Sequence, residues 1–258
     1  MINKKNFNKK NWNEKFPNHK VDLSKLYIHS SWKKIINNEF KKEYFKKINE
    51  LLSYCLKKTN GDVKIFPYPD NVFSSFNNTP FNKIKVVILG QDPYHNYFNE
   101  NNKIIPQADG LAFSVPIGIK IPSSLNNIFK NLIKFKHLKK KPKHGNLSLL
   151  AMQGILLLNT SLTVQCNHPN SHSKKWEFFT DNIIKYISNK KENIIFVLWG
   201  SNALKKKILI NEDKHKIIIS SHPSGLSCYK KLKNYGEFIN TDHFKFINNN
   251  IKSKLIFN

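Results

Sequence analysis

The residues of this chain that could do chemistry gather first in one polar hexapeptide. It reads Gly90-Gln91-Asp92-Pro93-Tyr94-His95 and so holds an amide, a carboxylate, a phenol and an imidazole within five positions. Carboxylates and imidazoles are common groups in general acid–base catalysis. Asp-Pro is also a frequent turn dipeptide, in which the aspartate side chain bonds to nearby backbone. The hexapeptide alone therefore leaves a catalytic turn and a plain polar turn both open.

The hexapeptide follows a segment that would hold it rigidly. Residues 84–89 form an apolar, β-branched run, interrupted only by Lys85, of the length of a buried strand. Gly90 permits a backbone geometry that other residues resist, while Pro93 pushes Asp92 toward an extended conformation. Ligands of open α/β sheets bind beyond the carboxyl ends of the strands. The sequence therefore places these polar side chains where a binding site is expected.

Three more apolar runs have the same character. They span residues 155–158, 194–198 and 216–219. Helical periodicity is found at 32–56 (one helix or two, capped by Ser30 or Ser31), 121–133 (with a serine as cap), 176–187, 203–210 and 244–255. We expect residues 96–105 to form a polar loop and residues 111–115 a short strand or extended segment.

This alternation predicts an α/β fold in a single domain, with a central four-stranded parallel sheet flanked by helices on both faces. The four strands run out into Asp92, Asn159, Ser201 and His222. Because the carboxyl ends of parallel strands share one edge of the sheet, we expect these four residues to lie close together.

The charge of the chain is strongly positive. Among 258 residues, 43 are basic and 17 acidic, a net charge of +26, and every basic residue is lysine. Such an excess favours a polyanionic partner. A coding bias toward A and T would also enrich Asn, Ile and Lys throughout, so the charge is weak support for nucleic-acid binding. Without arginine, phosphates would be met by lysine point charges or backbone amides.

Other features bear on location and organisation. Cys55, Cys166 and Cys228 lack metal-type spacing and suggest reduced thiols. No apolar run approaches the ~18 residues of a membrane helix. We expect a cytoplasmic protein without membrane contact, acting as a monomer. Residues 1–21 are expected to be a flexible basic N-terminal arm, and residues 22–258 the folded domain.

A second motif changes the odds for the hexapeptide. Residues 221–227 read Ser-His-Pro-Ser-Gly-Leu-Ser. The two motifs, in this order and at this approximate spacing, resemble the signatures of the family-1 uracil-DNA glycosylases. Further stretches of the chain also look like family sequence: 31–45, 79–81, 110–115, 144–148, 156–164 and 199–201. The resemblance implies an enzyme that removes uracil from DNA by cutting the N-glycosidic bond after flipping the nucleotide out, with no metal and no cofactor.

The resemblance implies two catalytic residues. Asp92 would stabilise the cationic sugar and orient or deprotonate the attacking water. His222 would donate a hydrogen bond to uracil O2 as negative charge grows there, and a neutral imidazole suffices for this. Taken without the family, His222 before Pro223 also suits a turn-capping imidazole.

Four residues would read the base. Asn159 has an amide that can donate to O4 and accept from N3–H, which cytosine would mismatch. By resemblance, Phe113 stacks on uracil, Tyr94 blocks the methyl group of thymine, and Gln91 lies near O2. Ordinary alternatives remain open at this point: a strand-end cap for Asn159 and a core side chain for Phe113.

The remaining matches concern DNA. His95 would contact the DNA backbone or the water, and Ser124, Ser201 and Ser224 would contact phosphates, although serines at helix starts also serve as caps. Leu226 would enter the duplex where the base leaves, because an apolar wedge offsets part of the unstacking energy. The expected partner is uracil-containing DNA, single- or double-stranded.

Some positions depart from the family pattern. Gly225 stands where proline is usual, Asp109 where histidine is common, and Ser123 where proline is usual. The stretch 228–242 is longer than usual and lacks the arginine of the family. These departures bear on DNA affinity more than on chemistry.

The expected function is therefore that of a monofunctional glycosylase, which starts base-excision repair and has no lyase activity. Three alternative functions remain. A catalytically inactive module of this fold would bind DNA or a replication partner without turnover. A nuclease would require a metal and would cut the backbone directly. A serine hydrolase would use Ser221 or Ser224, but no G-x-S-x-G motif is present.

Overall fold

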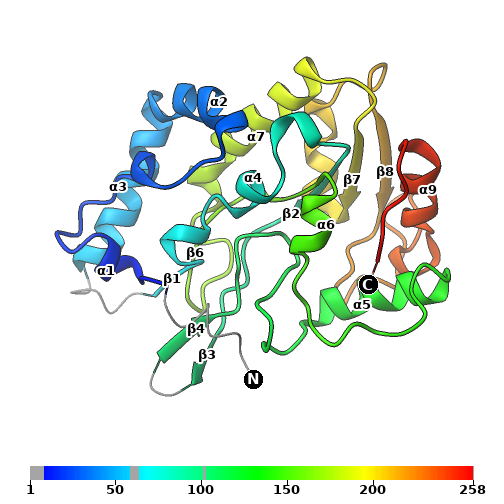
Figure 1. The fold of residues 1–258 in the computed structure, drawn as a ribbon, viewed down its shortest axis with the longest axis horizontal. Helices are drawn as coiled ribbons and strands as arrows, with labels where there is room; N and C mark the ends of the chain where they lie inside the picture. The colour runs from blue at the N-terminus through cyan, green and yellow to red at the C-terminus, as the bar shows by residue number, and fades with distance from the viewer. Residues whose placement is uncertain (1–8, 59–63, 101–102, 258) are drawn as a thin grey trace.

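The centre of the fold is a parallel sheet of four strands (Figure 1). The computed structural model describes residues 9–58, 64–100 and 103–257. The strands lie in the order β5 (Ile155–Asn159), β2 (Val86–Gly90), β7 (Ile195–Trp199) and β8 (Lys216–Ser220). All three pairings are parallel, and β2 pairs on both sides. The predicted four-stranded parallel sheet is confirmed, with the strand before the hexapeptide inside it.

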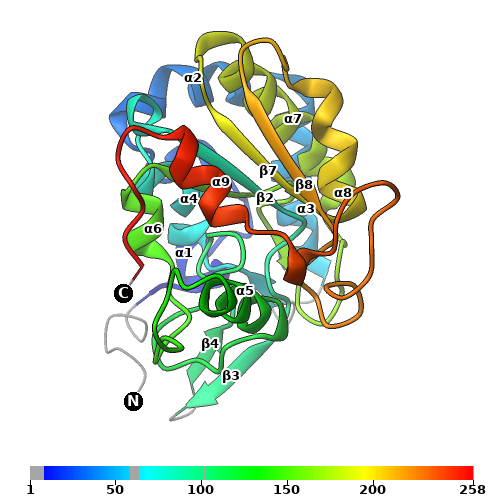
Figure 2. The ribbon, with the colours of Figure 1, turned by 90° about the vertical axis from the view of Figure 1, so that its right-hand side faces the viewer.

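Helices cover both faces of this sheet, as predicted (Figures 1 and 2). Alternate side chains of β2 enter two separate cores: Val87 and Leu89 one, Val86 and Ile88 the other. The first core is completed by α2 (Ser30–Phe40), α3 (Glu43–Lys58) and α7 (Ser173–Lys190). The second is completed by α5 (Ser123–Lys134), α6 (Ser148–Met152) and α9 (His243–Asn250). None of the described helices is long and apolar enough to cross a membrane.

The helix boundaries differ from the sequence pattern in identifiable ways. The 32–56 stretch is two helices, α2 and α3, and α2 is capped by His29, whose Nδ1 accepts from the backbone N–H of Ser31 at 3.2 Å. The expected serine caps of α2 and α5 are absent. The stretch 203–210 is α8 (Gly200–Leu204) followed by the 3-10 helix η5 (Lys205–Leu209), and the last helix ends at Asn250.

Several small elements were not predicted. A hairpin of β3 (Tyr97–Glu100) and β4 (Lys103–Pro106) replaces the expected polar loop, and β1 (Ile65–Phe66) pairs antiparallel with β6 (Val164–Gln165). The other short helices are η2 (Leu23–Lys25), η3 (Pro69–Asn71), α4 (Ser74–Asn78), η4 (Phe81–Lys83) and η6 (Phe238–Asn240). Each has at most five residues, too few to carry a hydrophobic period.

The N-terminal segment departs from the expected flexible arm. Residues 9–21 pack on the folded body, and they include α1 (Trp12–Lys15), which has a capping box of Asn11 and Glu14. Trp12 is 3% exposed, and its Nε1–H donates to the carbonyl of Pro67 at 3.0 Å. Phe16 is also buried. Burial of two aromatic rings offsets the entropy of ordering the segment. Residues 1–8 lie outside the described residues.

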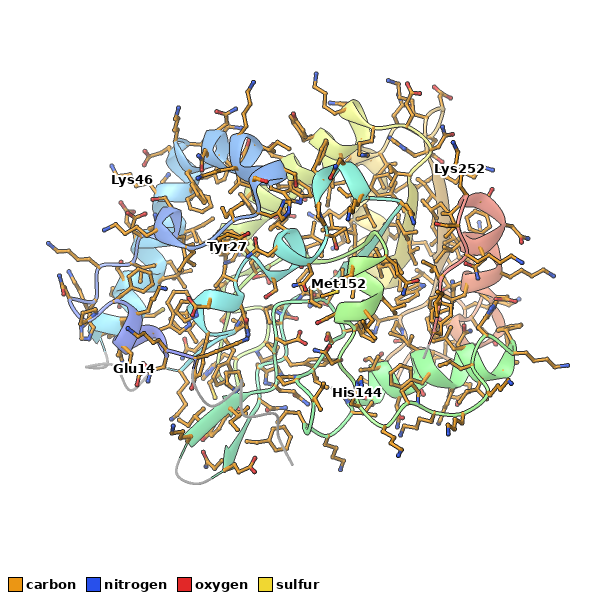
Figure 3. All side chains as sticks on the ribbon, viewed as in Figure 1. Glu14, Tyr27, Lys46, His144, Met152 and Lys252 are labelled. Atoms are coloured by element: carbon orange, nitrogen blue, oxygen red, sulfur yellow. The ribbon has the colours of Figure 1, made fainter. Side chains whose placement is uncertain are left out.

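The lysines are spread over the molecule. In Figure 3, Lys46 on α3 and Lys252 after α9 point outward at opposite sides. Lysines on opposite sides of the molecule are what a compositional bias would produce.

Candidate active site

The carboxyl ends of the central strands surround a cavity of about 220 Å³. Eight of the eleven predicted site residues line it: Gln91, Asp92, Tyr94, His95, Phe113, Ser124, Asn159 and His222. Ser201, Ser224 and Leu226 do not line the cavity. Asp92, Asn159 and His222 thus lie together at one edge of the sheet, as expected. Ser201, which follows β7 directly, lies outside the cavity.

Strand pairing positions Asn159. Gly90 and Asn159 are register partners at the ends of β2 and β5. A Cβ at Gly90 would lie 2.1 Å from Asn159 Oδ1 and 2.8 Å from the Ala112 Cβ. Only glycine leaves room for the amide to lie across this backbone. Asn159 is 6% exposed, so its amide borders the cavity from a fixed, buried position.

Asp92 is held by the chain that follows β6. Its Oδ2 accepts the backbone N–H of Asn170 at 2.7 Å. Burial raises the pKa of Asp92, while the hydrogen bond from Asn170 and the charge of His95 oppose that rise. The result is an oriented carboxylate that is more basic than one in water. A carboxylate of this kind can activate a water molecule or stabilise a neighbouring cation.

His222 is neutral and has a defined tautomer. Its Nδ1 accepts the backbone N–H of Ser224 at 3.0 Å, which places the ring proton on Nε2. Burial lowers the pKa of His222 to about 4. Gly200, at φ +88°, makes room for this ring: a Cβ there would lie 2.9 Å from the His222 Cβ. The ring is therefore a hydrogen-bond donor through Nε2–H near neutral pH.

Phe113 lies on a tight turn, which corrects the strand or extended segment expected at 111–115. Its backbone has φ +66°, in the left-handed region that side chains rarely adopt. The ring packs edge-on against Trp199, with centroids 5.4 Å apart, and 5.9 Å from the His222 ring. The Tyr94 hydroxyl donates to the Phe113 carbonyl at 3.4 Å. Phe113 therefore lines the cavity, while its backbone carbonyl is bonded by Tyr94 of the loop after β2.

Gln91 joins three loops around the cavity. Its backbone carbonyl accepts from the Thr160 hydroxyl at 2.8 Å and from the Ser161 N–H at 2.9 Å. Its side-chain amide accepts from Asn202 Nδ2 at 2.7 Å and donates to Asn170 Oδ1. The side chain thus links the loop after β2 to the loop after β6 and to helix α8, and Gln91 lines the cavity.

The four residues predicted to touch DNA through hydroxyls or an apolar side chain occupy the loops and helix starts beyond the strands. Ser124 and Ser201 are each the second residue of a helix, α5 and α8. Ser224 follows β8, and Leu226 is 85% exposed two residues later. A large apolar side chain on an exposed turn is available for insertion.

Some lining residues were missed by the sequence reasoning. These are Gly90, Pro93, Ala108, Gly110, Leu111 and Pro169. They are small or apolar residues; Gly90 and Pro93 were assigned only a backbone role in the hexapeptide, and the other four carry no chemical signal in the sequence. His95 lines the cavity as predicted, and its Nδ1 has no hydrogen-bond partner among the described residues. Within those same residues, no group of three or more His, Cys, Asp or Glu side chains could hold a metal ion.

Fold and site together describe an α/β protein in which a carboxylate, an amide, an aromatic ring and a neutral imidazole line one small cavity beyond the strand ends. The chain belongs to the uracil DNA glycosylase superfamily, whose family model matches residues 76–252. The uracil-DNA glycosylase of Borreliella burgdorferi (strain ZS7) is 49% identical over 221 residues, covering 85% of this chain and 92% of that protein. The Francisella philomiragia enzyme is 47% identical over 225 residues, covering 87% and 95%. The crystal structure of mimivirus uracil-DNA glycosylase matches with TM-score 0.91 and 38% identity, covering 99% of this chain and 95% of that one.

Proposed function

We propose that this chain excises uracil from DNA by hydrolysing the N-glycosidic bond, as a monofunctional glycosylase that initiates base-excision repair. Its family membership and its relatives named uracil-DNA glycosylase support this function. The single observation that carries the proposal is the convergence of Asp92, Phe113, Asn159 and His222 on one cavity of about 220 Å³.

The proposed reaction leaves positive charge on the sugar and negative charge on the departing base. The Asp92 carboxylate, which accepts the Asn170 N–H, stabilises the positive charge on the sugar and orients or deprotonates the attacking water. His222 stabilises the negative charge on the departing base by donating its Nε2–H to uracil O2 as that charge develops. Preorganised donors of this type each contribute ~10²–10³ in rate.

The proposed base recognition uses a polar edge and two rings. The Asn159 amide donates to O4 and accepts from N3–H, and cytosine would place an amino group against the donor. Phe113 stacks on the base, and Tyr94 closes the space that a thymine methyl group would need. The hydrogen bond from Tyr94 to the Phe113 carbonyl supports a fixed spacing between the two rings.

Of the residues proposed to contact DNA, His95 and Ser124 line the cavity, whereas Ser201, Ser224 and Leu226 lie outside it. Ser124, Ser201 and Ser224 meet phosphates through hydroxyls and neighbouring amides, and Leu226 fills the gap left by the flipped nucleotide. His95 contacts the DNA backbone or the attacking water. We propose that the enzyme acts as a monomer on single- or double-stranded DNA in the cytoplasm, a compartment favoured by three cysteines of which none forms a disulfide. Residues 22–258 are proposed as the catalytic domain, with the packed part of the N-terminal segment as its extension.

The test is incubation with an oligonucleotide containing one uracil, followed by alkali, in the presence of a chelator. Strand cleavage that depends on alkali and resists the chelator is expected. Matched oligonucleotides with thymine or cytosine should stay intact. Binding of uracil DNA without any cleavage would favour the inactive module, and chelator-sensitive cleavage without alkali would favour a nuclease.

A further inference from the structure

Asp109 is a buried carboxylate that the proposed mechanism does not use. Its Oδ1 accepts the backbone N–H of Leu111 at 3.1 Å. Its Oδ2 accepts the Ser114 hydroxyl at 2.5 Å and the Asn146 Nδ2–H at 3.2 Å. Leu111 and Ser114 flank the turn that carries Phe113. One carboxylate therefore ties together both sides of this turn and the segment that leads into α6.

The Phe113 turn needs such support. A non-glycine residue at φ +66° is held in a sparsely populated conformation, and it persists only when its surroundings fix it. The Tyr94 hydroxyl reaches the Phe113 carbonyl at 3.4 Å, a long hydrogen bond. The bonds to Asp109 are the shorter constraints on the turn, and they use a charged acceptor, which strengthens them.

The N-terminal segment brings a cation to the same place. Lys9 Nζ donates to Asn71 Oδ1 at 2.6 Å. The backbone carbonyl of Asn71 lies against Gly110, where a Cβ would be 1.9 Å away. Lys9 thus contacts Asn71, which packs against the neighbour of Asp109 in the chain, and the Lys9 and Asp109 charges attract each other. The segment is anchored there by buried Trp12 and by the Lys15–Asp70 ion pair of 2.9 Å.

The charged and titratable groups around Asp109 come from three elements. Lys9 faces it from the N-terminal segment, with Asp70 of η3 also attracting that ammonium. Tyr94 faces it from the loop after β2, and burial together with the Asp109 charge raises the pKa of this phenol, so it is neutral. Burial raises the pKa of Asp109 to about 6, while its hydrogen bonds and Lys9 oppose the rise.

We propose that Asp109 is a positioning residue for uracil excision, which as a carboxylate holds the Phe113 turn against the base, and that Lys9 keeps it ionised. The inference rests on the proposed function. When Asp109 takes up a proton, one oxygen becomes a donor and loses its hold on Ser114 or Asn146. The Phe113 ring then loses its fixed place, and both uracil binding and excision weaken. The N-terminal segment is in this way part of the catalytic apparatus.

The test is single-turnover excision from a single-stranded uracil oligonucleotide at saturating enzyme, between pH 5 and pH 8. Four variants are compared with the wild type: Asp109→Asn, Lys9→Met, Lys9→Arg and Lys10→Met. Saturation removes effects on DNA affinity, and exposed Lys10 is the matched control for loss of one charge. Inhibition by free uracil is measured in parallel, because it reports stacking on Phe113 without DNA.

As the pH is lowered, we expect the wild-type excision rate and the inhibition by free uracil to decrease together, with a midpoint near pH 6 where Asp109 takes up a proton. Asp109→Asn should lose that ionisation and stay at the low-pH level throughout. Lys9→Met should move the midpoint upward by about one unit, the lower end of what a nearby opposite charge does. Lys9→Arg and Lys10→Met should match the wild type.

A wild-type midpoint retained in Asp109→Asn, or the same midpoint in Lys9→Met and Lys10→Met, would overturn the inference. If Asp109→Asn does not fold, Lys9→Met still decides, since it keeps every hydrogen bond of the carboxylate. Absence of uracil excision by the wild type at every pH would instead refute the proposed function.

Discussion

At the residue scale, the pKa values of Asp92 and His222 move in the directions that glycosidic hydrolysis needs. Burial raises the pKa of Asp92, which makes it a stronger base, yet the Asn170 hydrogen bond limits the rise. Burial lowers the pKa of His222 to about 4, so the ring is neutral near pH 7 and can donate through Nε2–H, as the proposed reaction requires. The surroundings thus suit the two side chains to the opposite roles proposed for them.

Asp92→Asn tests the first role. The amide keeps the size of the side chain but has no negative charge and is a poor base, so the single-turnover rate should fall by ~10²-fold or more. Binding of uracil DNA, measured by fluorescence anisotropy, should be largely kept. The Asn170 N–H can still donate to the amide oxygen, which guards against a loss of loop structure. Near-wild-type single-turnover rates would remove Asp92 from catalysis.

Asn159→Asp tests the reading of the base. A carboxyl group can accept from the amino group of cytosine, where the amide donor is mismatched. We expect slow excision of cytosine to appear and excision of uracil to decrease. The readout is alkali cleavage of matched cytosine and uracil oligonucleotides, with Asn159→Leu as the variant that should lose both. A variant that still processes uracil and never cytosine would contradict this role of Asn159.

At the element scale, the sheet could be predicted and the turns could not. Three of the four strands are apolar runs buried along their whole length, and the edge strand β8 is a shorter apolar run that is partly buried, so the place of each follows from composition. The 97–106 hairpin has a mixed, mostly polar sequence, and its pairing depends on a partner strand that local pattern does not reveal. Phe113 was expected in an extended segment, because the local sequence pattern gives no sign of a left-handed φ at a non-glycine residue.

The loop after β8 gives the element-scale prediction. Leu226 is 85% exposed, and Gly225 has open space where a Cβ would be and a φ outside the left-handed region. Leu226→Ala should slow excision from duplex DNA more than from single strands, because only the duplex needs a wedge. Gly225→Pro should improve duplex excision modestly by lowering the loop's conformational entropy.

Both variants are measured by single-turnover excision on matched single- and double-stranded substrates. Equal slowing of Leu226→Ala on the two substrates would refute the wedge. Loss of duplex activity in Gly225→Pro would mean that DNA binding requires a backbone conformation closed to proline.

At the scale of the whole molecule, the N-terminal segment shows where sequence reasoning ends. Its lysines and asparagines are typical of a flexible arm, and only the isolated Trp12 and Phe16 hint at packing. Their burial depends on a groove formed by residues more than fifty positions away, such as Pro67. The sequence was more informative about the candidate site, because eight of the eleven predicted site residues line one cavity. Strand ends converge by topology, whereas docking of a terminal segment depends on the finished surface.

The whole molecule should also lose stability in mild acid. Burial lowers the pKa of His172, His222 and His243 to about 4 each, so these rings stay neutral in the folded state. In the unfolded chain they protonate near pH 6.5. As the pH falls from 6.5 to 4 the unfolded state binds more protons, and the free energy of unfolding decreases by up to about 1.4 kcal/mol per pH unit for each histidine. Asp109, with its raised pKa of about 6, acts in the opposite direction over part of this range.

We therefore expect urea unfolding to give a free energy that falls steeply between pH 6.5 and pH 4.5. His172→Gln should reduce the steepness by about one proton, because that ring is 2% exposed and its Nδ1 lies 2.9 Å from Thr163 Oγ1. Equal slopes in the wild type and His172→Gln would show that the His172 ring protonates in the folded protein.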